Sequence, residues 1–111
     1  MIKNNAIKYT EAFNAKDLQA VADMLHDDVV LEDPGVVHIE GKSKVVDAIK
    51  AIFDGAAQLS FEAKHIFVDG SASIIEFALD LDGTKLVGAD VVIWVGDKIK
   101  ELRAYVNAKA A

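Results

Sequence analysis

Three tight-turn dipeptides divide the second half of the chain, and they constrain its fold more than any other feature. They are Asp69-Gly70, Asp82-Gly83 and Gly96-Asp97. Such pairs between apolar runs are strong hairpin signals, because their residues tolerate the positive φ angles that tight hairpins require. We therefore predict an antiparallel meander of four long strands, over residues 59–69, 72–82, 85–95 and 98–106.

The first half of the chain has helical spacing instead. The apolar face of a first helix consists of Ile2, Ala6, Tyr9, Ala12 and Phe13. Asp17 is placed to cap a second helix, with an apolar stripe that reaches Leu25. Short strands over residues 29–33 and 36–39 precede a third helix over residues 41–55. Helices first and a meander last predict an α+β fold, with helices packed on one face of a sheet.

Length and composition set the class of protein. The chain has 111 residues, which corresponds to a single domain over residues 1–111. Its net charge of −6 argues against nucleic acid or an anionic membrane as a partner, since both require a basic surface. Without a signal-like N-terminus or a run of about 20 apolar residues, we expect a soluble, cytoplasmic protein.

The chain is unusually apolar, with 52% hydrophobic residues and a single proline. Residues 85–95 are apolar on both faces of the predicted strand, with Val87, Val91 and Ile93 on one face and Val92 and Trp94 on the other. Because helices cover only one face of the sheet, the second apolar face must adjoin a cavity, a ligand or a second subunit.

Several kinds of chemistry are excluded or disfavoured. The chain has no cysteine, no Gly-x-Ser-x-Gly motif and no glycine-rich phosphate loop. Its three histidines are far apart in sequence, and we interpret His26-Asp27-Asp28 as the solvated end of a helix rather than a metal site. We therefore expect neither a metal nor a cofactor.

Two carboxylates and one phenol lie in apolar surroundings. Asp33 shares a strand face with Val29 and Leu31, although an Asp-Pro pair can also simply begin a turn. Asp90 lies in the middle of the most apolar strand, where it either finds donors, stays protonated or faces solvent. Tyr9 lies on the apolar face of the first helix, where it can also be an ordinary core residue.

Taken together, these three residues suit enolisation chemistry. A carboxylate base can remove a proton next to a carbonyl group, while a phenol and a neutral carboxylic acid hold the oxygen as it becomes negative. This chemistry requires no metal, cysteine or cofactor.

The sequence also resembles a known family. Residues 8–18 and 26–34, with Asp33-Pro34 at their end, resemble the opening of the nuclear-transport-factor-2-like (NTF2-like) superfamily, which includes SnoaL-like proteins. Within it, the chain is most similar to bacterial Δ5-3-ketosteroid isomerases, whose helix tyrosine, catalytic Asp-Pro and late-strand Asp match Tyr9, Asp33 and Asp90. The resemblance continues through residues 88–104 and spans nearly the whole chain.

The resemblance implies a strongly curved, mostly antiparallel sheet that three helices close into a cone around an apolar pocket. It implies a homodimer through the outer sheet face and a small apolar ligand or substrate. Asp33 would be the general base, and Tyr9 and protonated Asp90 would donate hydrogen bonds to a dienolate oxygen; ketosteroid isomerase is a known example of a carboxylic acid kept neutral for this purpose. The residues expected to line the pocket are Phe13, Leu25, Phe53, Ile75, Phe77, Leu79, Val92, Trp94 and Leu102.

Two departures from the isomerases leave other functions open. Ile49 occupies the place of a supporting tyrosine, and alternation along the last strand directs Tyr105 out of the pocket. The hairpin over residues 72–95 is also about two residues shorter, which predicts a smaller pocket. The alternatives are a SnoaL-like protein that only binds an apolar ligand, and an Asp-dependent enzyme of the same fold, either an aldol-type cyclase or a hydrolase that uses an Asp-activated water molecule. Each expected lining residue can equally be plain core.

Overall fold

The computed structural model describes residues 1–108. Helices α1 (Ile2–Asn14) and α2 (Leu18–Asp23) come first, followed by strands β1 (Leu25–Asp33) and β2 (Val37–Glu40) and helix α3 (Lys42–Gly55). The meander then consists of β3 (Leu59–Asp69), β4 (Ala72–Leu81), β5 (Thr84–Val95) and β6 (Lys98–Ala108). The predicted α+β class is confirmed.

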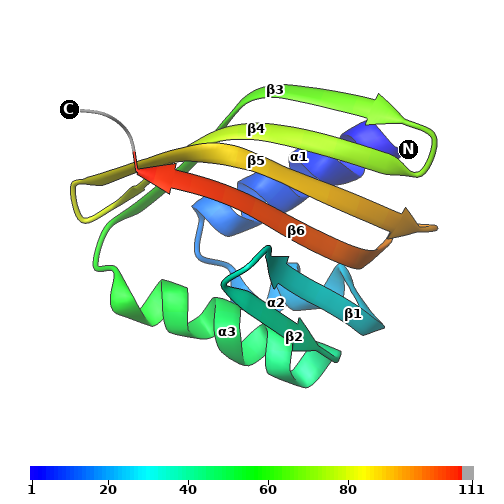
Figure 1. The fold of residues 1–111 in the computed structure, drawn as a ribbon, viewed down its shortest axis with the longest axis horizontal. Helices are drawn as coiled ribbons and strands as arrows, with labels where there is room; N and C mark the ends of the chain where they lie inside the picture. Colours follow the sequence, from blue (N-terminus) through cyan, green and yellow to red (C-terminus); the bar gives the residue numbers. More distant parts are fainter. Residues whose placement is uncertain (109–111) are drawn as a thin grey trace.

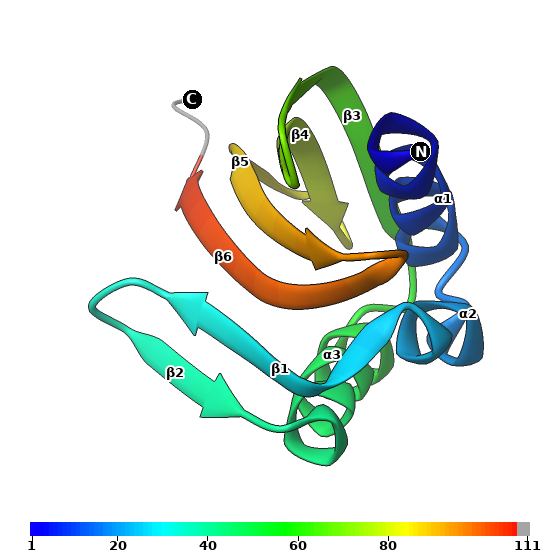
Figure 2. The same ribbon diagram turned by 90° about the vertical axis from the view of Figure 1, so that its right-hand side faces the viewer.

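One six-stranded sheet organises the molecule, in the order β2-β1-β6-β5-β4-β3. The four meander strands pair antiparallel, whereas β1 pairs with β6 in parallel. Figure 1 shows the four long strands side by side with α1 behind them. Figure 2 shows how strongly β5 and β6 bend, with α1 beside β3 and α3 next to β1. Helix α1 packs on β3 and β4 and helix α3 packs on β1, so the helices cover the concave face.

The predicted turn residues adopt the conformations for which they were singled out. Asp82 and Gly83 both have positive φ, at 53° and 94°, as a two-residue hairpin loop requires. Gly70 and Gly96 also have positive φ, at 59° and 62°. The meander therefore follows directly from local turn chemistry.

Two predicted boundaries are wrong in the first half of the chain. Helix α2 ends at Asp23, so Leu25 belongs to β1 and not to a helical stripe. His26, Asp27 and Asp28, predicted as a helix end, also lie in β1. The reason is tertiary: Leu25 pairs with Ile99 of β6, and the Ile99 N–H donates to the Met24 carbonyl oxygen at 2.7 Å.

The remaining differences are shifts of a few residues at element ends. The third helix begins at Lys42, directly after Gly41. Strand β2 is shifted by one residue, β4 ends one residue earlier, β5 begins one residue earlier and β6 continues to Ala108. Among the described residues, no helix has the length and apolar character that a membrane crossing requires.

Candidate functional site

Asp90 is the most unusual residue of the concave face. It is only 5% exposed, with Ile75 of β4 and Ala104 of β6 directly opposite it on the two neighbouring strands. Burial raises the pKa of the Asp90 carboxyl from its ordinary value of 3.8 to about 7, because the charged form loses its hydration. Asp90 is therefore largely protonated just below neutral pH, as a carboxylic acid that donates hydrogen bonds must be.

Tyr9 reaches the same region from helix α1. Its side chain is 2% exposed, and its ring packs against the rings of Phe13 and Phe61 at centroid distances of 6.0 and 6.4 Å. Burial raises the pKa of Tyr9 well above 10.0, and the negative charge of Asp90 raises it further. Both effects keep the proton on the phenol.

Neither group has a hydrogen-bond partner in the part of the chain that the structure describes. Among residues 1–108, the side-chain hydrogen bonds involve neither the Tyr9 hydroxyl nor the Asp90 carboxyl. Within the same range, every side-chain polar atom that is fully sealed from solvent does have a partner. Both groups therefore border space that water can reach. They are two unpaired donors in an apolar interior, where polar groups are normally paired.

Asp33 lies at the end of β1 and is half-buried. The ladder between β1 and β6 ends with the pair of Glu32 and Arg103. Extending this parallel register by one residue puts Asp33 beside Ala104. Ala104 in turn lies directly opposite Asp90. Asp33, Ala104 and Asp90 thus form one row across three adjacent strands, which places the backbones of the two acids about 10 Å apart.

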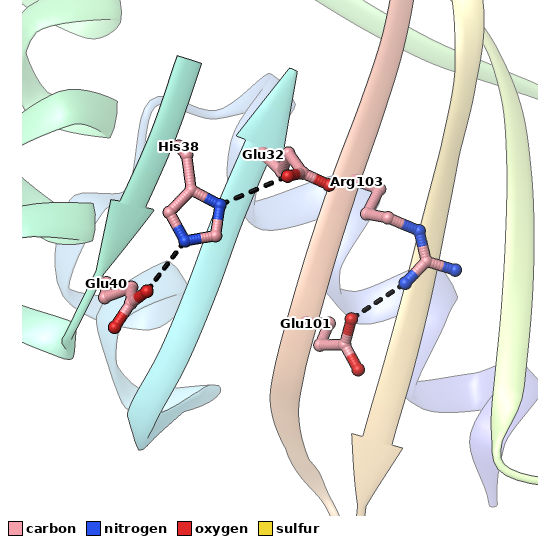
Figure 3. A network of polar contacts seen from close by, with 5 residues as sticks. All are labelled: Glu32, His38, Glu40, Glu101 and Arg103. Atoms are coloured by element: carbon pink, nitrogen blue, oxygen red, sulfur yellow. Dashed lines mark hydrogen bonds and ion pairs between the residues drawn. The ribbon is translucent and has the colours of Figure 1, made fainter. Parts of the chain in front are cut away.

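The residues next to Asp33 and Ala104 in sequence lie on the outer face of the sheet. In Figure 3, Glu32 and Arg103 lie together with His38, Glu40 and Glu101 on one face of the sheet. The His38 ring contacts both glutamates, at 2.7 Å to Glu40 and 3.1 Å to Glu32. Since neighbouring residues alternate, Asp33 and Ala104 lie on the opposite, concave face.

The hydrogen bonds of His38 raise its pKa from 6.5, mainly through Glu40 and then through Glu32. This cluster is exposed and stands apart from the row of Asp33, Ala104 and Asp90. Tyr105, which was predicted to point out of the pocket, is 46% exposed on the same outer face.

The residues expected to line the pocket form one hydrophobic core with the aromatic side chains under α1. The Phe61 ring packs in tilted orientations against the rings of Phe13 and Phe77, at centroid distances of 4.8 and 5.1 Å. Leu79 is partly buried, and the others are buried, namely Phe13, Leu25, Phe53, Ile75, Phe77, Val92, Trp94 and Leu102. Core packing accounts for these positions, so their role in ligand binding stays a prediction.

Ile49, in the expected place of a supporting tyrosine, is also a buried core residue of α3. Ser73 was not singled out from the sequence, yet it is fully buried and accepts a hydrogen bond from the Trp94 indole N–H at 3.0 Å. Its alternation with Ile75 and Phe77 along β4 is the signal that places it on the concave face.

The sequence as a whole matches one family model. The model of the SnoaL-like domain covers residues 6–102. The chain belongs to the SnoaL-like family. A comparison with curated proteins finds no relative of this SnoaL-like domain.

Solved structures share the fold at low sequence identity. A candidate ketosteroid isomerase from Kribbella flavida is 18% identical, with a TM-score of 0.86, over 97% of this chain and 78% of that one. An LEH-like epoxide hydrolase from M. tuberculosis is 21% identical, with a TM-score of 0.81, over 94% and 80%. A de novo designed protein with a curved β-sheet is 22% identical, with a TM-score of 0.81, over 96% and 84%. At such identities these likenesses establish the NTF2-like fold alone.

Proposed function

We propose that this SnoaL-like domain is a cofactor-independent isomerase that converts a β,γ-unsaturated ketone into the conjugated enone. The observation that carries the proposal is the pair of buried, unpaired donors, Tyr9 and Asp90, with the half-buried carboxylate of Asp33 in the same row of the sheet as Asp90. The likeness to a candidate ketosteroid isomerase from Kribbella flavida supports the same reaction class.

The reaction consists of two proton transfers. The Asp33 carboxylate removes a proton from the carbon between the carbonyl group and the double bond, and the electron pair moves onto the ketone oxygen to form a dienolate. The Tyr9 hydroxyl and protonated Asp90 donate hydrogen bonds to that oxygen, which they stabilise most strongly when its charge is greatest. Protonated Asp33 then returns the proton to the γ-carbon, and the double bond moves into conjugation.

The apolar surroundings serve this mechanism in two ways. They keep Asp90 protonated to about pH 7, so that it donates rather than repels the developing negative charge. They also exclude bulk water, which strengthens each hydrogen bond to the dienolate oxygen. Since Ile49 provides no hydroxyl, Tyr9 works here without a tyrosine behind it.

The test is a spectrophotometric assay of conjugated enone formation from a β,γ-unsaturated ketone. Asp33→Asn removes the base and is expected to lower kcat by about 100- to 10,000-fold. Tyr9→Phe removes one donor and is expected to lower kcat by about 100-fold or more. Asp90→Asn keeps an N–H donor and should lose less activity than Asp90→Leu.

Asp27→Asn is the matched control, because Asp27 is an exposed carboxylate of the same strand as Asp33. It should leave the rate unchanged. Turnover that survives Asp33→Asn in a folded protein would contradict the role of Asp33 as the base.

A second candidate function follows from the half-exposed position of Asp33 at the end of β1. Water reaches this carboxylate, so Asp33 could activate a water molecule as a hydrolase does, and one structural neighbour is named as an LEH-like epoxide hydrolase. Under this function, the protein opens an epoxide substrate and Asp33→Asn abolishes that activity. The unchanged protein, Tyr9→Phe and Asp90→Asn then all fail to isomerise the ketone.

A further inference from the structure

The residue between the two acids in their row is Ala104. It lies directly opposite Asp90 on β5, and it follows Arg103, whose partner Glu32 on β1 directly precedes Asp33. The backbones of the two acids are about 10 Å apart, and only a methyl group stands between them.

The face around this row changes abruptly in burial. On one side, Leu102 and Val92 are buried against the core. On the other side, Val106 and Gly88 form the next pair along the same strands, and both are partly exposed. The row therefore lies at the boundary between a buried part and a partly exposed part of the concave face.

The partly exposed side has no space for a side chain at position 88. A Cβ atom added at Gly88 would collide with the Tyr105 carbonyl oxygen and lie 3.1 Å from the Phe77 ring atom Cζ. Bare backbone and the Phe77 ring thus form the surface next to the row. The size of the side chain at position 104 therefore sets how much space a ligand ring has above this part of the sheet.

We propose that Ala104 determines which substrates the site accepts, because its methyl group is the floor on which the flat, ketone-bearing ring lies between Asp33 and Asp90. This inference rests on the proposed function and adds a specificity-determining residue to it. A larger side chain occupies the place of the ring, whereas glycine deepens the site.

The experiment measures binding and turnover separately. The probes are phenol and 2-naphthol, two flat rings whose oxygen can accept hydrogen bonds from Tyr9 and Asp90, and binding is measured by titration calorimetry. Ala104→Val is expected to weaken the binding of both probes by about tenfold or more, since added methyl groups in an apolar site have effects of this size. In the enone assay, Ala104→Val should raise KM by a larger factor than it lowers kcat.

Ala89→Val is the matched control. Ala89 precedes Asp90 on β5 and lies opposite the outward-facing Tyr105, so the same substitution adds the same methyl groups on the other face of the sheet. It is expected to bind both probes as the unchanged protein does. Ala104→Gly supplies the opposite perturbation and should raise the affinity for 2-naphthol relative to that for phenol.

The outcomes separate the inference from the proposed function. If the unchanged protein isomerises the enone and Ala104→Val binds and turns over equally well, the inference about Ala104 is overturned while the function stands. If no variant isomerises the ketone but Ala104→Val still loses probe binding, the function fails and the inference stands. If Ala104→Val does not fold, Ala104→Gly decides: an unchanged ratio of the affinities for 2-naphthol and phenol overturns the inference. A complete absence of probe binding to the unchanged protein also overturns it.

Discussion

The buried carboxyl of Asp90 makes a quantitative prediction about stability. In the folded protein its pKa is about 7, against 3.8 for an unperturbed aspartate. Between these two values the folded state keeps a proton that the unfolded chain has released. The free energy of unfolding therefore falls as pH rises from about 4 to about 7 and is constant above that range, as far as this group is concerned.

The magnitude follows from the size of the pKa shift. A shift of about three pKa units corresponds to about 4 kcal/mol over the full titration. Replacing Asp90 by Asn removes the titration, so Asp90→Asn should gain stability relative to the unchanged protein as pH rises. Between pH 5 and pH 8 the difference in the free energy of unfolding should grow by about 3 kcal/mol.

The assay is urea unfolding followed by the fluorescence of Trp94, which is the only tryptophan and is buried. The raised pKa of His38 also contributes to the pH dependence, since it adds stability at low pH that is lost as pH rises through the folded value. Both chains contain His38, so its contribution cancels in the difference.

Asp27→Asn, which removes an exposed carboxyl, should give a flat difference curve and serves as the control. A flat curve for Asp90→Asn as well would refute the reasoning, because it would mean that Asp90 is hydrated in the folded protein.

Three further predictions concern packing, backbone geometry and assembly. Ser73→Ala leaves the Trp94 indole N–H buried without its partner at 3.0 Å. The free energy of unfolding in urea titrations should fall by about 1–3 kcal/mol, and a decrease of less than about 0.5 kcal/mol would contradict a buried hydrogen bond. Gly88→Ala places a Cβ against the Tyr105 carbonyl oxygen and should destabilise the fold by about 3 kcal/mol or more, seen as a lower Tm by circular dichroism. A homodimer through the outer face predicts twice the 12.0 kDa chain mass in light scattering, and Tyr105→Asp, with Phe67→Asp as a second variant on that face, should give the monomer. A monomeric mass of the unchanged protein at every concentration would contradict the dimer.

The meander was predictable because its determinants are local. Asp82 and Gly83 carry the hairpin conformation in their own backbone preferences, and alternation then assigns each strand residue to a face. The same alternation put Asp90 on one face with Val92 and Trp94, but it left open whether that face is buried or solvent-exposed. The burial of Asp90 depends instead on the tertiary packing of helices α1 and α3 on the sheet, which the strand pattern does not contain.

The row of Asp33, Ala104 and Asp90 was not predictable from the sequence. It depends on the parallel pairing of β1 with β6, two strands that are far apart in the chain, and on a shift of register between Leu25 and Val30. An alanine carries no chemical signal of its own. Ala104 acquires a role only because the folded sheet places it between two carboxylates.

The energetics of Asp90 bear on why this chain has a site at all. A de novo designed protein has the same curved sheet at a TM-score of 0.81, so the fold itself does not depend on any reaction. At neutral pH the buried carboxyl lowers the stability of this chain, whereas an apolar residue of similar volume would pack beside Ile75 and Val92 without that penalty. Positions that violate the rules of folding are where function is expected. Asp90→Val should therefore make the protein more stable at pH 8 and lower kcat by about 100-fold or more. A more stable variant with full activity would show that Asp90 is not a donor to the substrate oxygen.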